Sequence, residues 1–225
     1  MSIEQTEGIV LRGVDFSESS RIVTFVTPLH GRVACMVKGV RRPKSAQAPV
    51  LDTMNRVDLT YYWRESRQVQ QLKETSLLDG YSAIKRDLER SLNAALPLEL
   101  AGHVVQENEP SEMLYATLRH GLDTLATWPG EAGAHATWQM VQLLAVAGFA
   151  PDPEGFESET SAAIGQQPAR LSPEDRDGLT TLLAGAESCP DIAVSGTLRT
   201  AILNFAAHQL DCTFRSARVL HQVFG

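Results

Sequence analysis

Five short runs within the first 76 residues are typical of β-strands, and no helical period separates them. The clearest run is residues 56–63, where Val57, Leu59 and Tyr61 alternate with polar residues. The other runs are residues 8–16, 21–27, 32–38 and 69–75. The turn residues Pro-Leu-His-Gly at 28–31 predict that the second and third runs pair as a hairpin.

This pattern of strands favours a closed barrel over an open sheet. Five short strands without a long helix cannot bury both faces of a flat sheet, whereas closure into a barrel removes the exposed edges. We therefore expect residues 1–79 to form a five-stranded OB-fold barrel, a frequent carrier of single-stranded nucleic acid. An SH3-like barrel has the same number of strands and is an open alternative.

From residue 81 onward the apolar period becomes helical. A long apolar stripe begins at Ile84 and is expected to be interrupted near Pro97. Further helices are predicted after an N-cap at Ser111, at 134–149, after the cap Ser172, at 195–209 and at 215–223. Residues 150–170 are acidic and rich in Pro, Gly, Ser and Gln, so we expect a loop there. Residues 80–225 are thus predicted to be an all-α domain, giving an α+β multidomain protein.

The charge of the chain is divided unevenly between these two parts. Residues 1–80 contain 11 Lys and Arg against 9 Asp and Glu, a net charge of +2. Residues 81–225 contain 9 against 18, a net charge of −9. Such an asymmetry indicates different partners for the two parts, with nucleic acid suited to the first and proteins to the second.

The residues expected to contact DNA are cations of the first part together with one aromatic side chain. Four cations cluster in the loop after the third strand, where they would neutralise phosphates: Lys38, Arg41, Arg42 and Lys44. A second tier comprises Arg12, Arg21 and Arg32. Tyr62 is the candidate for base stacking, because Tyr61 and Trp63 fall on the inner face. The alternative is a solvated loop whose charge is incidental.

No arrangement of residues in the sequence is typical of catalysis. There is no glycine-rich phosphate loop, His-Glu-x-x-His stretch or close cysteine pair. The three cysteines are widely spaced and odd in number, which fits a reducing compartment. No apolar stretch approaches the roughly 20 residues of a membrane span, and no secretory signal is visible. We expect a cytoplasmic protein that is not an enzyme and holds no cofactor or metal.

Several runs of residues resemble the RecO family of recombination mediators, in the order and spacing of that family. In the first part these are Gly8-Ile9-Val10-Leu11, Ser17-Glu18-Ser19, Ile22-Val23-Thr24 and Val37-Lys38-Gly39-Val40-Arg41-Arg42. In the second part they are residues 142–151, which resemble a helix ending in Leu-Gly-Tyr/Phe-x-Pro, and residues 215–220, which are similar to a Lys/Arg-Ser-x-Arg-x-Leu segment.

The resemblance implies a bacterial, nucleoid-associated DNA-repair protein that binds single- and double-stranded DNA and anneals complementary strands. It also implies contact with RecR and with the acidic, Phe-ending tail of the single-strand-binding protein, so that RecA is loaded onto covered strands. That tail would bind the helical domain, where Trp138 and Gln142 could line an apolar hole and Arg119 could supply the cation. Trp138 as ordinary core is the alternative.

One feature departs from the family pattern. Many members carry a four-cysteine zinc module, whereas residues 152–170 of this chain contain no cysteine, so we expect no zinc. Two other functions would share the barrel and its basic loop: a generic OB-fold module that binds RNA, and a scaffold that binds only proteins.

Overall fold

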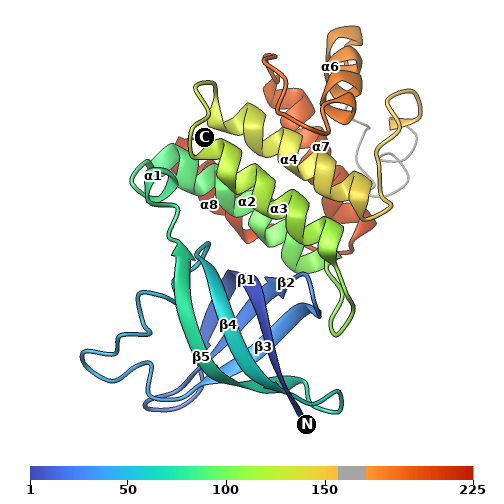
Figure 1. The fold of residues 1–225 in the computed structure, drawn as a ribbon. Coiled ribbons are helices and arrows are strands. Elements are labelled where there is room, and N and C mark those ends of the chain that lie inside the picture. The colour runs from blue at the N-terminus through green and yellow to red at the C-terminus, as the bar shows by residue number, and fades with distance from the viewer. Residues whose placement is uncertain (157–170, 225) are drawn as a thin grey trace. The chain divides into compact units, whose positions relative to one another are not determined.

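The computed structural model describes residues 1–156 and 171–224, which form two compact units (Figure 1). The first unit comprises Met1–Ser82 and Val105–Arg119, and the second comprises Ala83–Val104 and the described part of His120–Gly225. The strands are β1 (Ser2–Asp15), β2 (Arg21–Thr27), β3 (Gly31–Val37), β4 (Arg56–Trp63) and β5 (Val69–Asp79). The described helices are α1 (Ser82–Lys85), α2 (Leu88–Val104), α3 (Glu112–Leu125), α4 (Ala132–Val146), α6 (Pro173–Ala184), α7 (Gly196–Gln209) and α8 (Arg215–Phe224). The predicted order, a β domain followed by helices, is confirmed.

The five strands close into a barrel in the order β1-β2-β3-β5-β4. Neighbouring strands are antiparallel except for β3 and β5, which are parallel and pair Ala34 with Val69 and Met36 with Gln71. The predicted hairpin between β2 and β3 is confirmed, with Arg21 opposite Val37. Alternate residues of each strand point inward and form the apolar barrel core: Val10, Val23, Phe25, Val33, Cys35, Val37, Val57, Leu59, Tyr61 and Leu72.

Two strands are longer than their side chains predicted. β1 begins at Ser2 rather than at residue 8, since its polar first residues pair with β4 from Ser2 opposite Trp63 onward. β5 continues to Asp79 because it stays paired with β4 as far as Arg56. In both cases the backbone hydrogen bonds of the ladder, rather than an apolar face, extend the strand.

The turn between β2 and β3 packs against residues 105–119 within the first unit. The amide of Arg32 donates to the carbonyl of Gln106 (2.9 Å), and the amide of Ser111 donates to the carbonyl of Pro28 (3.0 Å). Gly31 has a φ of +59°, and the carbonyl oxygens of Gln106 and Glu109 lie where its Cβ would be. This close approach therefore requires glycine.

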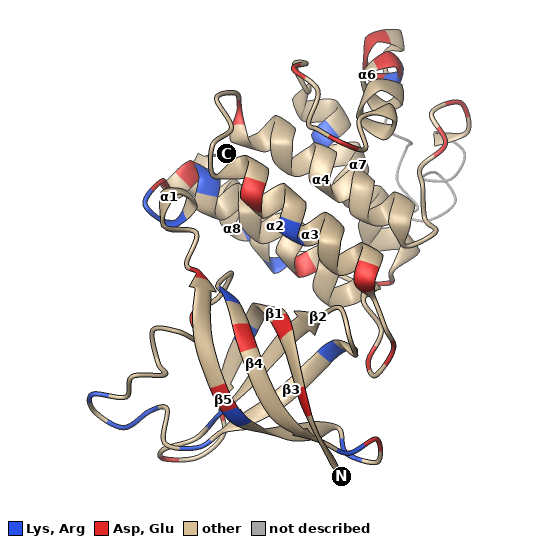
Figure 2. Ribbon diagram, in the orientation of Figure 1, with Lys and Arg blue, Asp and Glu red and all other residues tan. Residues whose placement is uncertain are grey.

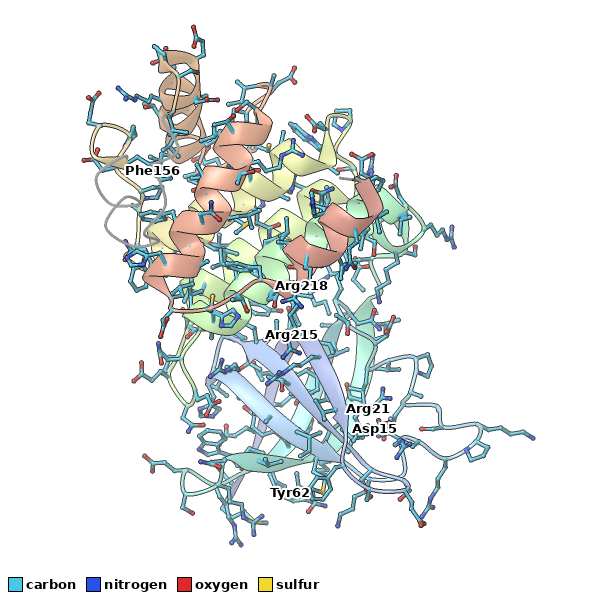
Figure 3. All side chains as sticks on the ribbon, turned by 180° about the vertical axis from the view of Figure 1, so that it is seen from behind. Asp15, Arg21, Tyr62, Phe156, Arg215 and Arg218 are labelled. Atoms are coloured by element: carbon cyan, nitrogen blue, oxygen red, sulfur yellow. The ribbon has the colours of Figure 1, made fainter. Side chains whose placement is uncertain are left out.

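The second unit is built around α4. Every residue from Ala132 to Leu144 is buried, so α4 is covered on all its faces, by α2, α6 and α7. α6 begins with the predicted cap, in which the amide of Asp175 donates to Ser172 and the carboxylate of Asp175 accepts from the amide of Ser172. Phe156, the last residue described before the gap, is buried and stacks on Phe205 with ring centroids 5.4 Å apart (Figure 3).

The predicted interruption at Pro97 is wrong, because α2 continues through this residue. A proline in a helix removes one backbone hydrogen bond, at a cost of about 3 kcal/mol. In α2 the burial of Leu96, Leu98 and Leu100 on both sides of the proline offsets that cost. Packing thus outweighs the local signal.

The remaining expectations concern the acidic loop, a metal site and membrane-spanning helices. The loop predicted at 150–170 lies outside the described residues from residue 157 onward, as does most of the segment compared with the zinc module. Within residues 1–156 and 171–224, no three His, Cys, Asp or Glu side chains come together in a group suited to a metal ion. In the same ranges, no helix combines the length and the apolar character that crossing a membrane would require.

Candidate nucleic-acid interface

The long loop between β3 and β4 is anchored at both ends in the barrel core. Val40 and Leu51 are buried in the core cluster, and the side-chain amide of Asn55 donates to the carbonyls of Pro49 (2.9 Å) and Val50 (3.0 Å). Between the two anchors the side chains are mostly exposed, and Figure 2 shows Lys and Arg on this loop. The stretch 41–50 is therefore largely exposed to solvent, while the residues at its two ends are fixed in the barrel core.

All four cations of the predicted cluster are exposed: Lys38, Arg41, Arg42 and Lys44. Among the described residues, no carboxylate is within ion-pairing distance of Lys38, Arg42 or Lys44. The amide of Arg42 donates to the carbonyl of Gly39 (3.1 Å), which closes a tight turn at the start of the loop. These three side chains keep their charge available for phosphates.

Arg41 ties the loop to the turn between β1 and β2. Its amide donates to the carbonyl of Ser19 (3.2 Å), and its guanidinium donates to the carbonyl of Ser17 and lies 3.2 Å from a carboxylate oxygen of Asp15. The other oxygen of Asp15 accepts from Nε of Arg21 at 3.0 Å. Asp15 thus holds two of the predicted cations together, and Figure 3 shows Asp15 beside one of them, Arg21.

The remaining second-tier cations lie on different parts of the barrel. Arg12 is exposed on the outer face of β1, opposite Thr24 of β2. Arg32 is half-buried and forms an ion pair with Glu107 at 3.0 Å, next to the segment that packs on the β2–β3 turn. Arg12 therefore belongs to an open surface, whereas the charge of Arg32 is already partly neutralised within the first unit.

The aromatic residues of β4 divide between the two sides of the barrel wall. Tyr61 is fully buried, as the alternation predicted, and Trp63 packs against the core and stacks on His30 with ring centroids 3.7 Å apart. Tyr62 lies on the outer face between Ile3 of β1 and Gln71 of β5. Figure 3 shows Tyr62 apart from Asp15 and Arg21. Its use in base stacking stays a prediction.

Trp138 and Gln142, the residues predicted to line a partner pocket, are buried in the second unit. Nε1 of Trp138 donates to the carbonyl of Gly185 and Nε2 of Gln142 donates to the carbonyl of Leu182, each at 2.6 Å. Gln142 thereby joins α4 to α6, and Trp138 joins α4 to the C-cap of α6. These contacts favour the alternative that Trp138 is core. Arg119 belongs to the first unit, where its guanidinium lies 3.9 Å from a carboxylate oxygen of Glu7.

The turn between β4 and β5 carries two cations that the sequence analysis did not assign to the site, Arg64 and Arg67. Both are exposed, and the buried side chain of Gln70 is hydrogen-bonded to the backbone of each. A signal was present in the sequence, because Gln70 shares the inward parity of Leu72 and is therefore a polar residue at a core position.

The chain matches two family models that describe the two parts of one protein. Residues 1–81 match "Recombination protein O N terminal", and residues 85–154 match "Recombination protein O C terminal". The chain belongs to the RecO family. The two matches together cover about two thirds of its residues, and the boundary between them falls where the strands give way to helices.

Curated relatives from several bacteria support the same assignment to the RecO family. The chain is 32% identical to the DNA repair protein RecO of Salinibacter ruber, over 63% of the chain and 54% of that protein. It is 27% identical to that of Prosthecochloris aestuarii, over 67% and 57%, and 35% identical to that of Chloroherpeton thalassium, over 52% and 47%. The chain spans about half the length of the curated relatives it matches.

Proposed function

We propose that this chain acts in DNA repair as a recombination mediator. It binds single- and double-stranded DNA, anneals complementary strands and, with RecR, helps to load RecA onto strands covered by the single-strand-binding protein. The observation that carries the proposal is the exposed cationic loop, anchored by Val40 and Leu51 and joined through Arg41 to the β1–β2 turn. The relatives named DNA repair protein RecO support the biological role.

The barrel is proposed to be an OB-fold that uses its usual binding surface. In OB-folds, oligonucleotides bind the face of strands 2 and 3 and the loops after strands 1 and 4. Here those loops are the β1–β2 turn, to which Arg41 is bonded, and the β4–β5 turn with Arg64 and Arg67. Strand order and the placement of these cations support the assignment.

Annealing requires no chemical step, so the function that we propose is not enzymatic. Two strands held on a cationic surface repel each other less and meet at a raised local concentration. The thiols of Cys35 and Cys189 are buried and have raised pKa values, which suits packing better than catalysis. Burial raises the pKa of Cys35 to about 12, and burial together with Asp191 raises that of Cys189 to about 12, so both stay protonated.

An annealing assay tests the proposal. Two complementary fluorescent oligonucleotides are mixed with the protein at two salt concentrations without ATP, and then again after both are covered with the cognate single-strand-binding protein. We expect faster annealing that weakens with salt, because each phosphate contact releases counterions. The double variant Arg41→Glu, Arg42→Glu should lose the acceleration. The matched control Arg86→Glu, Arg218→Glu changes the charge equally at exposed positions of the helical unit and should keep it.

The alternatives give different results in the same assay. A folded wild-type protein that does not accelerate annealing would overturn the proposal and favour a scaffold for proteins. Loss of DNA binding on addition of an equal amount of single-stranded RNA would favour a generic RNA-binding module. Acceleration of bare strands alone, without an effect on covered strands, would remove the mediator role and leave annealing.

A further inference from the structure

The outer face of β1, β2 and β3 is a regular patch made by the register of three strands. Arg12 lies opposite Thr24, which lies opposite Ala34, and Val14 lies opposite Ile22, which lies opposite Met36. These residues alternate with the core residues of the same strands, so their side chains point away from the barrel interior. The patch therefore has two rows. The row of Val14, Ile22 and Met36 is apolar, and the row of Arg12, Thr24 and Ala34 begins with a cation.

Phe16 continues this patch beyond the end of β1. It follows Val14 by two positions, and its side chain is 60% exposed, more than that of Val14 at 56%. The backbone beneath it is held in a tight turn, since the amides of Phe16 and Ser17 both donate to the carbonyl of Ser20, at 3.1 and 3.3 Å. In turn the amide of Ser20 donates to the hydroxyl of Ser17. The exposed aromatic ring of Phe16 is thus carried by a turn whose backbone is held by hydrogen bonds.

Two cations lie close to the turn that carries Phe16. Lys38 follows Val37, which pairs with Arg21, and this places Lys38 level with Ser20 and hence with Phe16 across the strands. The guanidinium of Arg41 donates to the carbonyl of Ser17, the residue after Phe16, and is paired with Asp15, the residue before it. An exposed aromatic ring with cations close by offers a face to an unpaired base and positive charges to the phosphates next to that base.

We propose that Phe16 is a stacking platform for an unpaired nucleobase, with Lys38 and Arg41 binding phosphates near that base. The inference rests on the proposed DNA binding and extends it to the choice between strand types. Bases of a duplex are already stacked on their neighbours and offer no free face, whereas bases of a single strand do. Phe16 therefore favours single-stranded over double-stranded DNA.

The test measures the affinity of the full chain for single-stranded and double-stranded oligonucleotides of equal length at several salt concentrations. We expect Phe16→Ala to lower the affinity for single strands between about fivefold and about a hundredfold, the range of one lost base–aromatic stack. The affinity for duplex and the salt slope should stay at their wild-type values, because no phosphate contact is lost. Phe16→Trp should retain binding, with added tryptophan fluorescence that is quenched by single-stranded DNA.

Leu29→Ala is the matched control, because Leu29 is another exposed apolar residue of the first unit and lies in the β2–β3 turn. It should leave both affinities unchanged. An equal loss for single strands and duplex in Phe16→Ala, or no loss in either, would overturn the stacking role while leaving the proposed function intact. A wild-type protein that binds neither DNA would overturn both. Thermal unfolding of each variant verifies that it is folded.

Discussion

The side-chain amide of Gln70 is hydrogen-bonded to both backbone polar atoms of Arg64. Its oxygen accepts from the amide of Arg64 at 3.0 Å, and its nitrogen donates to the carbonyl of Arg64 at 3.0 Å and to that of Arg67 at 2.8 Å. Gln70 is 2% exposed, so these bonds are shielded from water. A buried side chain thereby fixes the backbone of a turn whose own side chains are cationic and exposed.

Replacing Gln70 by leucine tests the importance of these bonds. The substitution keeps the volume of the side chain but leaves two carbonyls and one amide without their partner, so we expect the free energy of unfolding to fall by roughly 1–3 kcal/mol. Urea unfolding measures the loss. The control Gln68→Leu, at an exposed position of the same turn, should have little effect. Equal stability of the two variants would contradict the role of Gln70.

Asp15 is expected to weaken DNA binding, because it neutralises Arg21 and Arg41 at once. Asp15→Asn should therefore raise the affinity for DNA about two- to fivefold at low salt, the range of one exposed ion pair, and should steepen the salt slope. Titration of a labelled oligonucleotide measures both. Glu74→Gln removes the same charge at an exposed position of β5 and should change affinity less. Weaker binding by Asp15→Asn would show that the carboxylate matters more for positioning the arginines.

Gly31→Ala should be strongly destabilising. The φ of +59° disfavours a side chain, and the new Cβ would collide with the carbonyl oxygens of Gln106 and Glu109. Together these effects should cost roughly 2–5 kcal/mol. Gly148 has a φ of +85° but nothing within 4 Å of its Cβ position, so Gly148→Ala isolates the backbone cost of about 1 kcal/mol. Similar losses in urea unfolding for the two variants would rule out the collision.

The stability of the protein should fall as the pH drops from about 6.5 towards 4, through His135. Burial, with smaller effects of His120 and Arg90, lowers the pKa of His135 from 6.5 to about 4. In this range the unfolded chain binds the proton and the folded chain does not, so acid favours unfolding by up to about 3 kcal/mol. Its Nε2 is 2.9 Å from the hydroxyl of Thr124.

His135→Gln removes the titrating group and keeps a polar side chain near Thr124. The difference in unfolding free energy between wild type and this variant should therefore shrink or change sign as the pH is lowered from 7 to 4.5. The exposed His221→Gln serves as the control and should follow the wild-type dependence. A difference between wild type and His135→Gln that stays constant with pH would contradict the buried neutral state.

The sequence predicts those parts of the fold whose signal lies in the side chains. β2 and β4 have the predicted ends, because β-branched and aromatic residues occupy most of their positions. Residues 2–7 of β1 are polar, and their strand structure depends on pairing with β4, which no local pattern reveals. At Pro97 the local sequence predicted a break in the helix, but α2 continues because packing within the second unit outweighs the cost of the proline.

The candidate site divides in the same way. Lys38, Arg41, Arg42 and Lys44 are close in sequence, so their cluster is visible before the fold is known. The ion pair between Arg41 and Asp15 joins residues that are distant in sequence, and only the barrel brings them together. Trp138 shows the limit of composition, because an exposed pocket and a buried core use the same apolar residues.

The anchoring of the long loop by Val40 and Leu51 separates folding from recognition. Both anchors are part of the barrel core, and Arg41 and Val50 make their own contacts with the barrel, so it is positions 42–48 that contribute little to its stability. The entropy of closing a loop rises slowly with length, by about 0.6 kcal/mol for each doubling. The length and charge of positions 42–48 can therefore be redesigned, or can diverge during evolution, while the barrel that displays them persists.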